Sequence, residues 1–92
     1  MNIFAEMAEK IIEEQESIMG PIALEQANKV EGLRMDWSKH EVILEGNATD
    51  ILEKLVEQYE HLFGQASIEA CKEAIRSLLP QLPKNQIPTL LK

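Results

Sequence analysis

Residues 47–79 hold two amphipathic segments separated by a glycine, and this stretch most constrains how the chain can fold. Asn47 is placed to cap the first segment as a helix, and Gly64 is placed to end it. Ser67 is the predicted cap of a second helix, which Pro80 stops. Because apolar stripes are unstable in water alone, we predict a helical hairpin with Leu55 and Ile75 in its core. The stripes are Ile51, Leu52, Leu55, Val56, Tyr59, Leu62 and Phe63, then Ile68, Cys71, Ala74, Ile75, Leu78 and Leu79.

The N-terminal part predicts two further helices. From Asn2 to about Ile18 the apolar residues again recur at helical spacing. Gly20 and Pro21 predict a break, because glycine suits the end of one helix and proline suits the first turn of the next. A shorter helix then runs towards Gly32. The apolar face of the first helix comprises Phe4, Met7, Ala8, Ile11, Ile12, Ile18 and Met19.

Between Gly32 and Gly46 the apolar period changes from helical to alternating, which is typical of β-strands. Leu33, Met35 and Trp37 lie on one side of the first run, and residues 41–45 form a second β-favouring run. We predict a hairpin that turns over residues 38–40. Such a hairpin is marginal in isolation, so it must pack on the helices or pair with another strand edge.

The predicted fold class is therefore a small, mostly helical α+β domain of order ααββαα over residues 1–79. A C-terminal tail over residues 80–92 follows, and its prolines exclude a regular helix. The tail is apolar at Leu82, Ile87, Leu90 and Leu91. It is predicted to be either a strap over the domain or a docking peptide.

Length and charge limit the function classes. A chain of 92 residues forms one domain. Its 16 acidic and 9 basic residues give a formal charge of −7, which repels nucleic acid and anionic membranes, so neither is an expected partner. No apolar run approaches the roughly 20 residues that span a bilayer. The first residues show no secretion signal, so we expect a cytoplasmic location.

Few side chains can carry chemistry. Glu57 and His61 share a helix face and could ligate a metal, but two ligands do not complete a site, and a solvated pair is the simpler interpretation. His40 falls in the predicted turn, and the acidic residues at 13–16 are interpreted as the solvated side of a helix. The lone Cys71 is predicted to be a buried thiol. We therefore predict no catalytic residue, no cofactor and no metal site.

The segment Ile18–Ala23 reads Ile-Met-Gly-Pro-Ile-Ala, with Ala27 one turn later. It resembles the "IGPIA" signature of an uncharacterised helical region appended to bacterial serine/threonine kinases and response regulators, including cyanobacterial ones. The resemblance covers about ten residues, and the sequence departs from that pattern after Val30. It implies a signalling setting and assigns no functional residue.

Together these patterns predict a non-catalytic protein-interaction or regulatory module. The alternatives are a sensor of a small apolar ligand and an accessory subunit of a larger enzyme. A homodimer is predicted, with another protein as a further partner, because the chain is short for its apolar content and a hairpin has unpaired edges. The competing prediction is that the tail covers the first helix and keeps the chain monomeric. The predicted interface residues are Phe4, Met7, Ile11, Ile18, Trp37, Ile87, Leu90 and Leu91.

Overall fold

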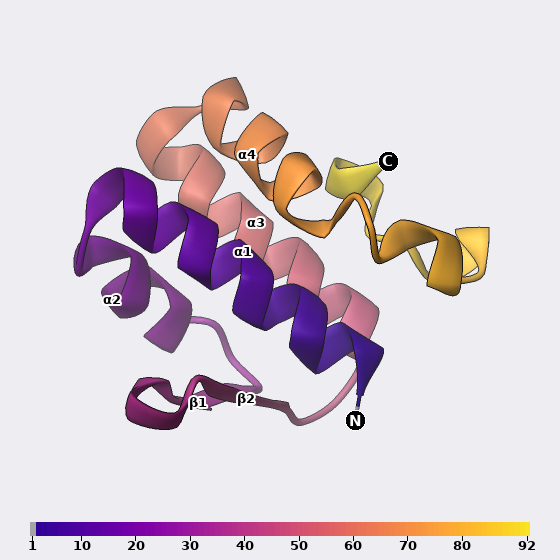
Figure 1. Cartoon of the computed structure of the whole chain (residues 1–92), viewed down its shortest axis with the longest axis horizontal. Coiled ribbons are helices and arrows are strands. Elements are labelled where there is room, and N and C mark those ends of the chain that lie inside the picture. The colour runs from indigo at the N-terminus through magenta and orange to yellow at the C-terminus, as the bar shows by residue number, and fades with distance from the viewer. Residues whose placement is uncertain (1) are drawn as a thin grey trace.

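The computed structural model describes residues 2–92 and shows a small α+β domain of order ααββαα. Its elements are α1 (Ile3–Met19), α2 (Ile22–Asn28), β1 (Leu33–Asp36), β2 (Glu41–Leu44), α3 (Ala48–Phe63) and α4 (Gln65–Ile75). α1 packs against α4 on one side and against α2 and the β1–β2 hairpin on the other, with α3 behind it (Figure 1). Within residues 2–92, no helix is both long and apolar enough to cross a membrane.

The predicted break between the first two helices is confirmed. The side-chain oxygen of Asn2 accepts a hydrogen bond from the backbone N–H of Phe4 at 2.8 Å and so caps α1. α1 ends at Met19, and α2 begins at Ile22 directly after Pro21. Local cap chemistry therefore sets both ends of α1.

The helical hairpin of α3 and α4 is also present, but both predicted ends of its second helix are wrong. Asn47 caps α3 as expected, accepting from the backbone N–H of Asp50 at 3.0 Å. α4, however, begins at Gln65 and not after a cap at Ser67. Gly64 both ends α3 and precedes α4, because its φ of +64° lets the chain reverse within one residue. Ser67 is consequently buried inside the first turn of α4.

The end of α4 also differs from its prediction. The helix ends at Ile75, before Pro80 is reached. The chain continues through non-helical turns into a 3₁₀ turn over Leu79–Gln81, where the proline occupies an early position. Proline is accommodated there because the backbone N–H groups of the first residues of a helical turn form no hydrogen bond within that turn, so the missing N–H of proline costs nothing.

The two strands form an antiparallel hairpin in which Leu33 pairs with Leu44 and Asp36 pairs with Glu41. Trp37 does not extend the first strand, as its place in the alternating run predicted, but opens a 3₁₀ turn over Trp37–Lys39. At the base of the hairpin Gly32 has a φ of +88°, and a Cβ atom there would lie 2.6 Å from the carbonyl oxygen of Glu45. Only glycine lets the two strand ends approach this closely.

The tail folds back as a strap onto α3 and α4. Thr49 Oγ1 donates to the carbonyl oxygen of Gln86 at 3.0 Å, and the backbone N–H of Leu90 donates to Glu53 Oε1 at 2.8 Å. Leu91 is 1% exposed and belongs to the main core. The tail does not supply the main cover of the α1 stripe, because α4, α2 and β2 pack there.

The difference in burial between two leucines of α3 predicts that their substitution by alanine lowers the free energy of unfolding by different amounts. Leu55 is 0% exposed, so Leu55→Ala should lower the free energy of unfolding by about 2–5 kcal/mol. Leu62 is 44% exposed, so the matched control Leu62→Ala should cost less than about 1 kcal/mol. Urea unfolding followed by circular dichroism measures both values. Equal losses for the two variants would contradict the burial that the structure shows.

Candidate functional site

The side chains predicted to form an interface differ widely in exposure. Met7, Ile11 and Leu91 are almost fully buried within the chain, so their area is not available to a partner. Ile18 is 54% exposed. The others are partly buried against the core: Phe4, Trp37, Ile87 and Leu90. The predicted contact surface along α1 is therefore mostly covered by the chain itself.

Exposed large apolar side chains gather instead at the two turns between helices. Ile18 and Ile22 flank the α1–α2 turn and are 54% and 47% exposed. Leu62 and Phe63 end α3 and are 44% and 51% exposed. Both turns lie at the same end of the helical bundle, on the left of Figure 1. We call these four residues the end patch.

Two buried hydrogen bonds hold the elements that carry the end patch. The hydroxyl of Tyr59 in α3 donates to the carbonyl oxygen of Ala23 in α2 at 2.9 Å. Ala23 directly follows Ile22, and Phe63 lies one helical turn beyond Tyr59. On the other side of α1, Gln15 Nε2 donates to the carbonyl oxygen of Ser67 in α4 at 3.2 Å. The end patch therefore rests on a fixed framework.

Hydrophobic periodicity did not identify this surface. The stripe of α3 predicted that Leu62 and Phe63 are buried, and that prediction is wrong. The two side chains are in register with the core face, but the chain reverses at Gly64, and the first buried residue of α4 is Ser67. The last turn of α3 thus extends beyond its packing partners. Helical spacing indicates which face a residue occupies, but not whether another element covers that turn.

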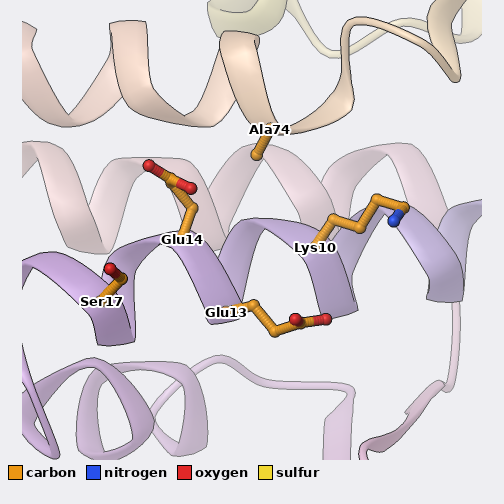
Figure 2. A pocket seen from close by; sticks show the side chains of 5 residues that line it. All are labelled: Lys10, Glu13, Glu14, Ser17 and Ala74. Carbon is orange, nitrogen blue, oxygen red and sulfur yellow. The ribbon is translucent and has the colours of Figure 1, made fainter.

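A groove between α1 and α4 is lined by Lys10, Glu13, Glu14, Ser17 and Ala74. Figure 2 shows the side chains of Lys10 and Glu14 on the side of α1 that faces α4, whereas Glu13 extends away from Ala74. The groove has a volume of about 360 Å³ and is open to solvent. Charged side chains form most of its lining, so it lacks the apolar walls that hold small apolar ligands.

A second groove, of about 490 Å³, lies between the first half of α1 and the hairpin. Glu9 and His40 are among its lining residues. A carboxylate oxygen from each of Glu9 and Glu13 and a ring nitrogen of His40 lie within 4.8 Å of one another. These three residues could hold a metal ion. The i,i+4 spacing of the two glutamates is visible in the sequence, but no sequence signal brings His40 to them.

The predicted pairing of Glu57 with His61 gains no third ligand in the structure. Among residues 2–92, the one group of three or more potential ligand side chains is that of Glu9, Glu13 and His40. A metal site needs converging ligands from more than one turn of a helix. The structure therefore favours the α1–hairpin groove over α3 as the place for a cation.

The titratable groups with shifted pKa values lie in the core. Burial raises the pKa of the Cys71 thiol from 9.0 to about 12; a hydrogen bond from Gln15 lowers it and the charge of Glu14 raises it. Burial, and then the proximity of Cys71, raises the pKa of the Tyr59 phenol well above its usual range. Both shifts favour the protonated form. Neither side chain is therefore prepared to act as a nucleophile or base at neutral pH.

Comparison with protein-family models, with curated proteins and with solved structures gave no significant match to this chain.

The environment of Cys71 predicts slow modification of its thiol. At pH 8 the native chain should react with Ellman's reagent at least about a hundredfold more slowly than the urea-unfolded chain, because reaction requires opening of the core. The native thiol also retains its proton to higher pH than the unfolded thiol. The free energy of unfolding should therefore fall as the pH rises above 9 towards 12.

The variant Cys71→Ala separates the pH dependence of stability that is caused by the Cys71 thiol from that caused by other titrating groups. Between pH 8 and 10 the variant should lose less stability with rising pH than the unsubstituted chain, because one proton-linked group has been removed. Unfolding in urea at several pH values measures the slope. Rapid labelling of the native thiol, or an unchanged slope in the variant, would contradict the buried and protonated state.

Proposed function

We propose that this protein is a non-catalytic protein-interaction module that docks through the end patch. The observation that carries the proposal is the concentration of four exposed large apolar side chains at one end of the bundle. Scattered exposed apolar residues need no special explanation, but a cluster on a small domain commonly marks a contact surface. One further large apolar side chain, Ile43, is similarly exposed, and it lies on the hairpin.

The distribution of polar groups supports a non-catalytic role. Catalytic sites combine a pocket with side chains whose pKa values are tuned towards reaction. Here the shifted groups, Cys71 and Tyr59, are in the core and are shifted towards the inert form. Cys71 is also a free thiol, which is compatible with the reducing cytoplasm that we propose as the location of this module.

The occupant that we propose for the end patch is a second copy of the chain. A closed twofold arrangement is the commonest way to cover an apolar patch, because each copy presents the same surface to the other. The formal charge of −7 on each copy opposes this contact at low salt. Added salt screens that repulsion, so the dimer should strengthen with salt, whereas binding of a basic partner should weaken.

The resemblance of Ile18–Ala23 to the "IGPIA" signature indicates the kind of process in which the proposed module would act. Ile18 and Ile22 supply half of the end patch and lie within this segment. The signature implies bacterial signalling, so the module would regulate by association.

The two alternative functions, a sensor of small apolar ligands and an accessory enzyme subunit, require different structural features. A sensor of small apolar ligands needs an enclosed apolar cavity, whereas both grooves beside α1 are open to solvent. The groove beside α4 is also lined mainly by charged residues. An accessory enzyme subunit would use the same end patch, but with a different protein as its occupant.

The proposal predicts a salt-strengthened dimer. Sedimentation equilibrium across micromolar concentrations should show monomer–dimer association that is tighter at about 0.5 M than at about 0.05 M NaCl. Phe63→Gln should weaken it at least about tenfold, because the substitution replaces a large aromatic side chain of the proposed contact with a polar one. The matched control is Ile43→Gln, which alters a similarly exposed apolar residue outside the patch.

Three outcomes would contradict the dimer. The first is a constant monomer mass at both salt concentrations. The second is association that Phe63→Gln leaves unchanged. The third is equal weakening by Ile43→Gln, which would place the contact on the hairpin.

A further inference from the structure

Three metal-ligating side chains from two elements come together between α1 and the hairpin turn, and two of them, Glu9 and His40, line the groove there. Glu9 and Glu13 are one helical turn apart on α1, and His40 ends the hairpin turn. Their potential ligand atoms lie within 4.8 Å of one another. Ligands of a tetrahedral ion with bonds of about 2.0 Å are about 3.3 Å apart, so a small rotation of the surface carboxylates completes the geometry.

The three side chains are free to bind a cation. No ion pair or hydrogen bond between described residues 2–92 uses the carboxylates of Glu9 and Glu13 or the imidazole of His40. By contrast, Glu16 on the same side of α1 accepts a hydrogen bond. Two neighbouring carboxylates without a cationic partner repel each other, and a bound cation would relieve that repulsion.

The hairpin turn is held in the position that the site requires. Trp37 Nε1 donates to Glu16 Oε1 at 3.1 Å, which fixes the start of the turn on α1. The rings of Trp37 and His40 have centroids 4.4 Å apart, and the backbone N–H of His40 donates to the carbonyl oxygen of Trp37 at 3.1 Å. Glu9, Glu13 and Glu16 follow one another along the same face of α1. The hydrogen bond between Trp37 and Glu16 therefore places His40 beside Glu9 and Glu13.

We infer that Glu9, Glu13 and His40 form a binding site for one divalent cation of the zinc class. The imidazole selects a borderline transition-metal ion over Mg²⁺ and Ca²⁺, which prefer all-oxygen sites. Three protein ligands leave at least one position for water. The bound ion ties the hairpin turn to α1 and so acts as a clip between two elements. This site is separate from the proposed docking function.

Zinc chloride is the probe for this site. Isothermal titration should show one Zn²⁺ per chain, with binding unchanged by a large excess of Mg²⁺. His40→Asn removes the imidazole but keeps a residue that tolerates the φ of +52° at this position. This variant and Glu13→Gln should each weaken binding at least about tenfold. Circular dichroism checks that both variants are folded.

The pair on α3 provides matched controls, because His61→Asn and Glu57→Gln remove the same chemical groups from another surface helix. Both should bind zinc as the unsubstituted chain does. Zinc should also raise the midpoint of thermal unfolding in the unsubstituted chain and in the controls, but not in His40→Asn. No saturable binding, an unaffected His40→Asn variant, or an equal loss in His61→Asn would overturn the inference.

Discussion

α1 packs simultaneously against α4, α2, α3 and the second strand, and α3 in turn packs directly against α4 and α2. Met7, Ala8, Ile11 and Ile12 are completely buried by these neighbours. Burial of each large apolar side chain contributes about 1.5–3 kcal/mol, which is substantial against the roughly 5–15 kcal/mol by which a domain is stable. A small chain cannot leave this helix half covered. The hairpin and the short α2 therefore complete the cover that α4 begins.

Polar contacts within this packing fix how the elements are aligned. Gln15 is fully buried and reaches from α1 to Ser67 and Cys71 in α4, but its Oε1 atom has no hydrogen-bond partner among the described residues. A buried acceptor without a partner costs about 1–3 kcal/mol. The amide therefore contributes more to the relative position of α1 and α4 than to stability. A purely apolar contact would allow the two helices to slide more easily.

Local chemistry explains which features could be predicted from the sequence. The cap at Asn47 and the break at Gly20 and Pro21 depend on one or two residues, and the structure has each where it was predicted. The start of α4 was misplaced because a serine is a good cap in general, whereas Gly64 already reverses the chain. Cap preferences do not include the geometry of the preceding helix.

The candidate sites were harder to predict because they depend on contacts distant in sequence. Periodicity assigned Leu62 and Phe63 to the buried face, but only the position of α4 reveals that their turn is uncovered. Likewise, His40 meets Glu9 only because the hairpin folds back across α1. Of the predicted interface residues, Ile18 alone remains substantially exposed.

The two marked ends of the chain lie in the half of the molecule opposite the turns that carry the end patch (Figure 1). The longest dimension of the domain is 32 Å, and it runs between these two halves. The strap holds the C-terminal segment against the beginning of α3, far from Phe63. A tag, an immobilised surface or a fused domain attached at either end would therefore leave the apolar end pointing outwards.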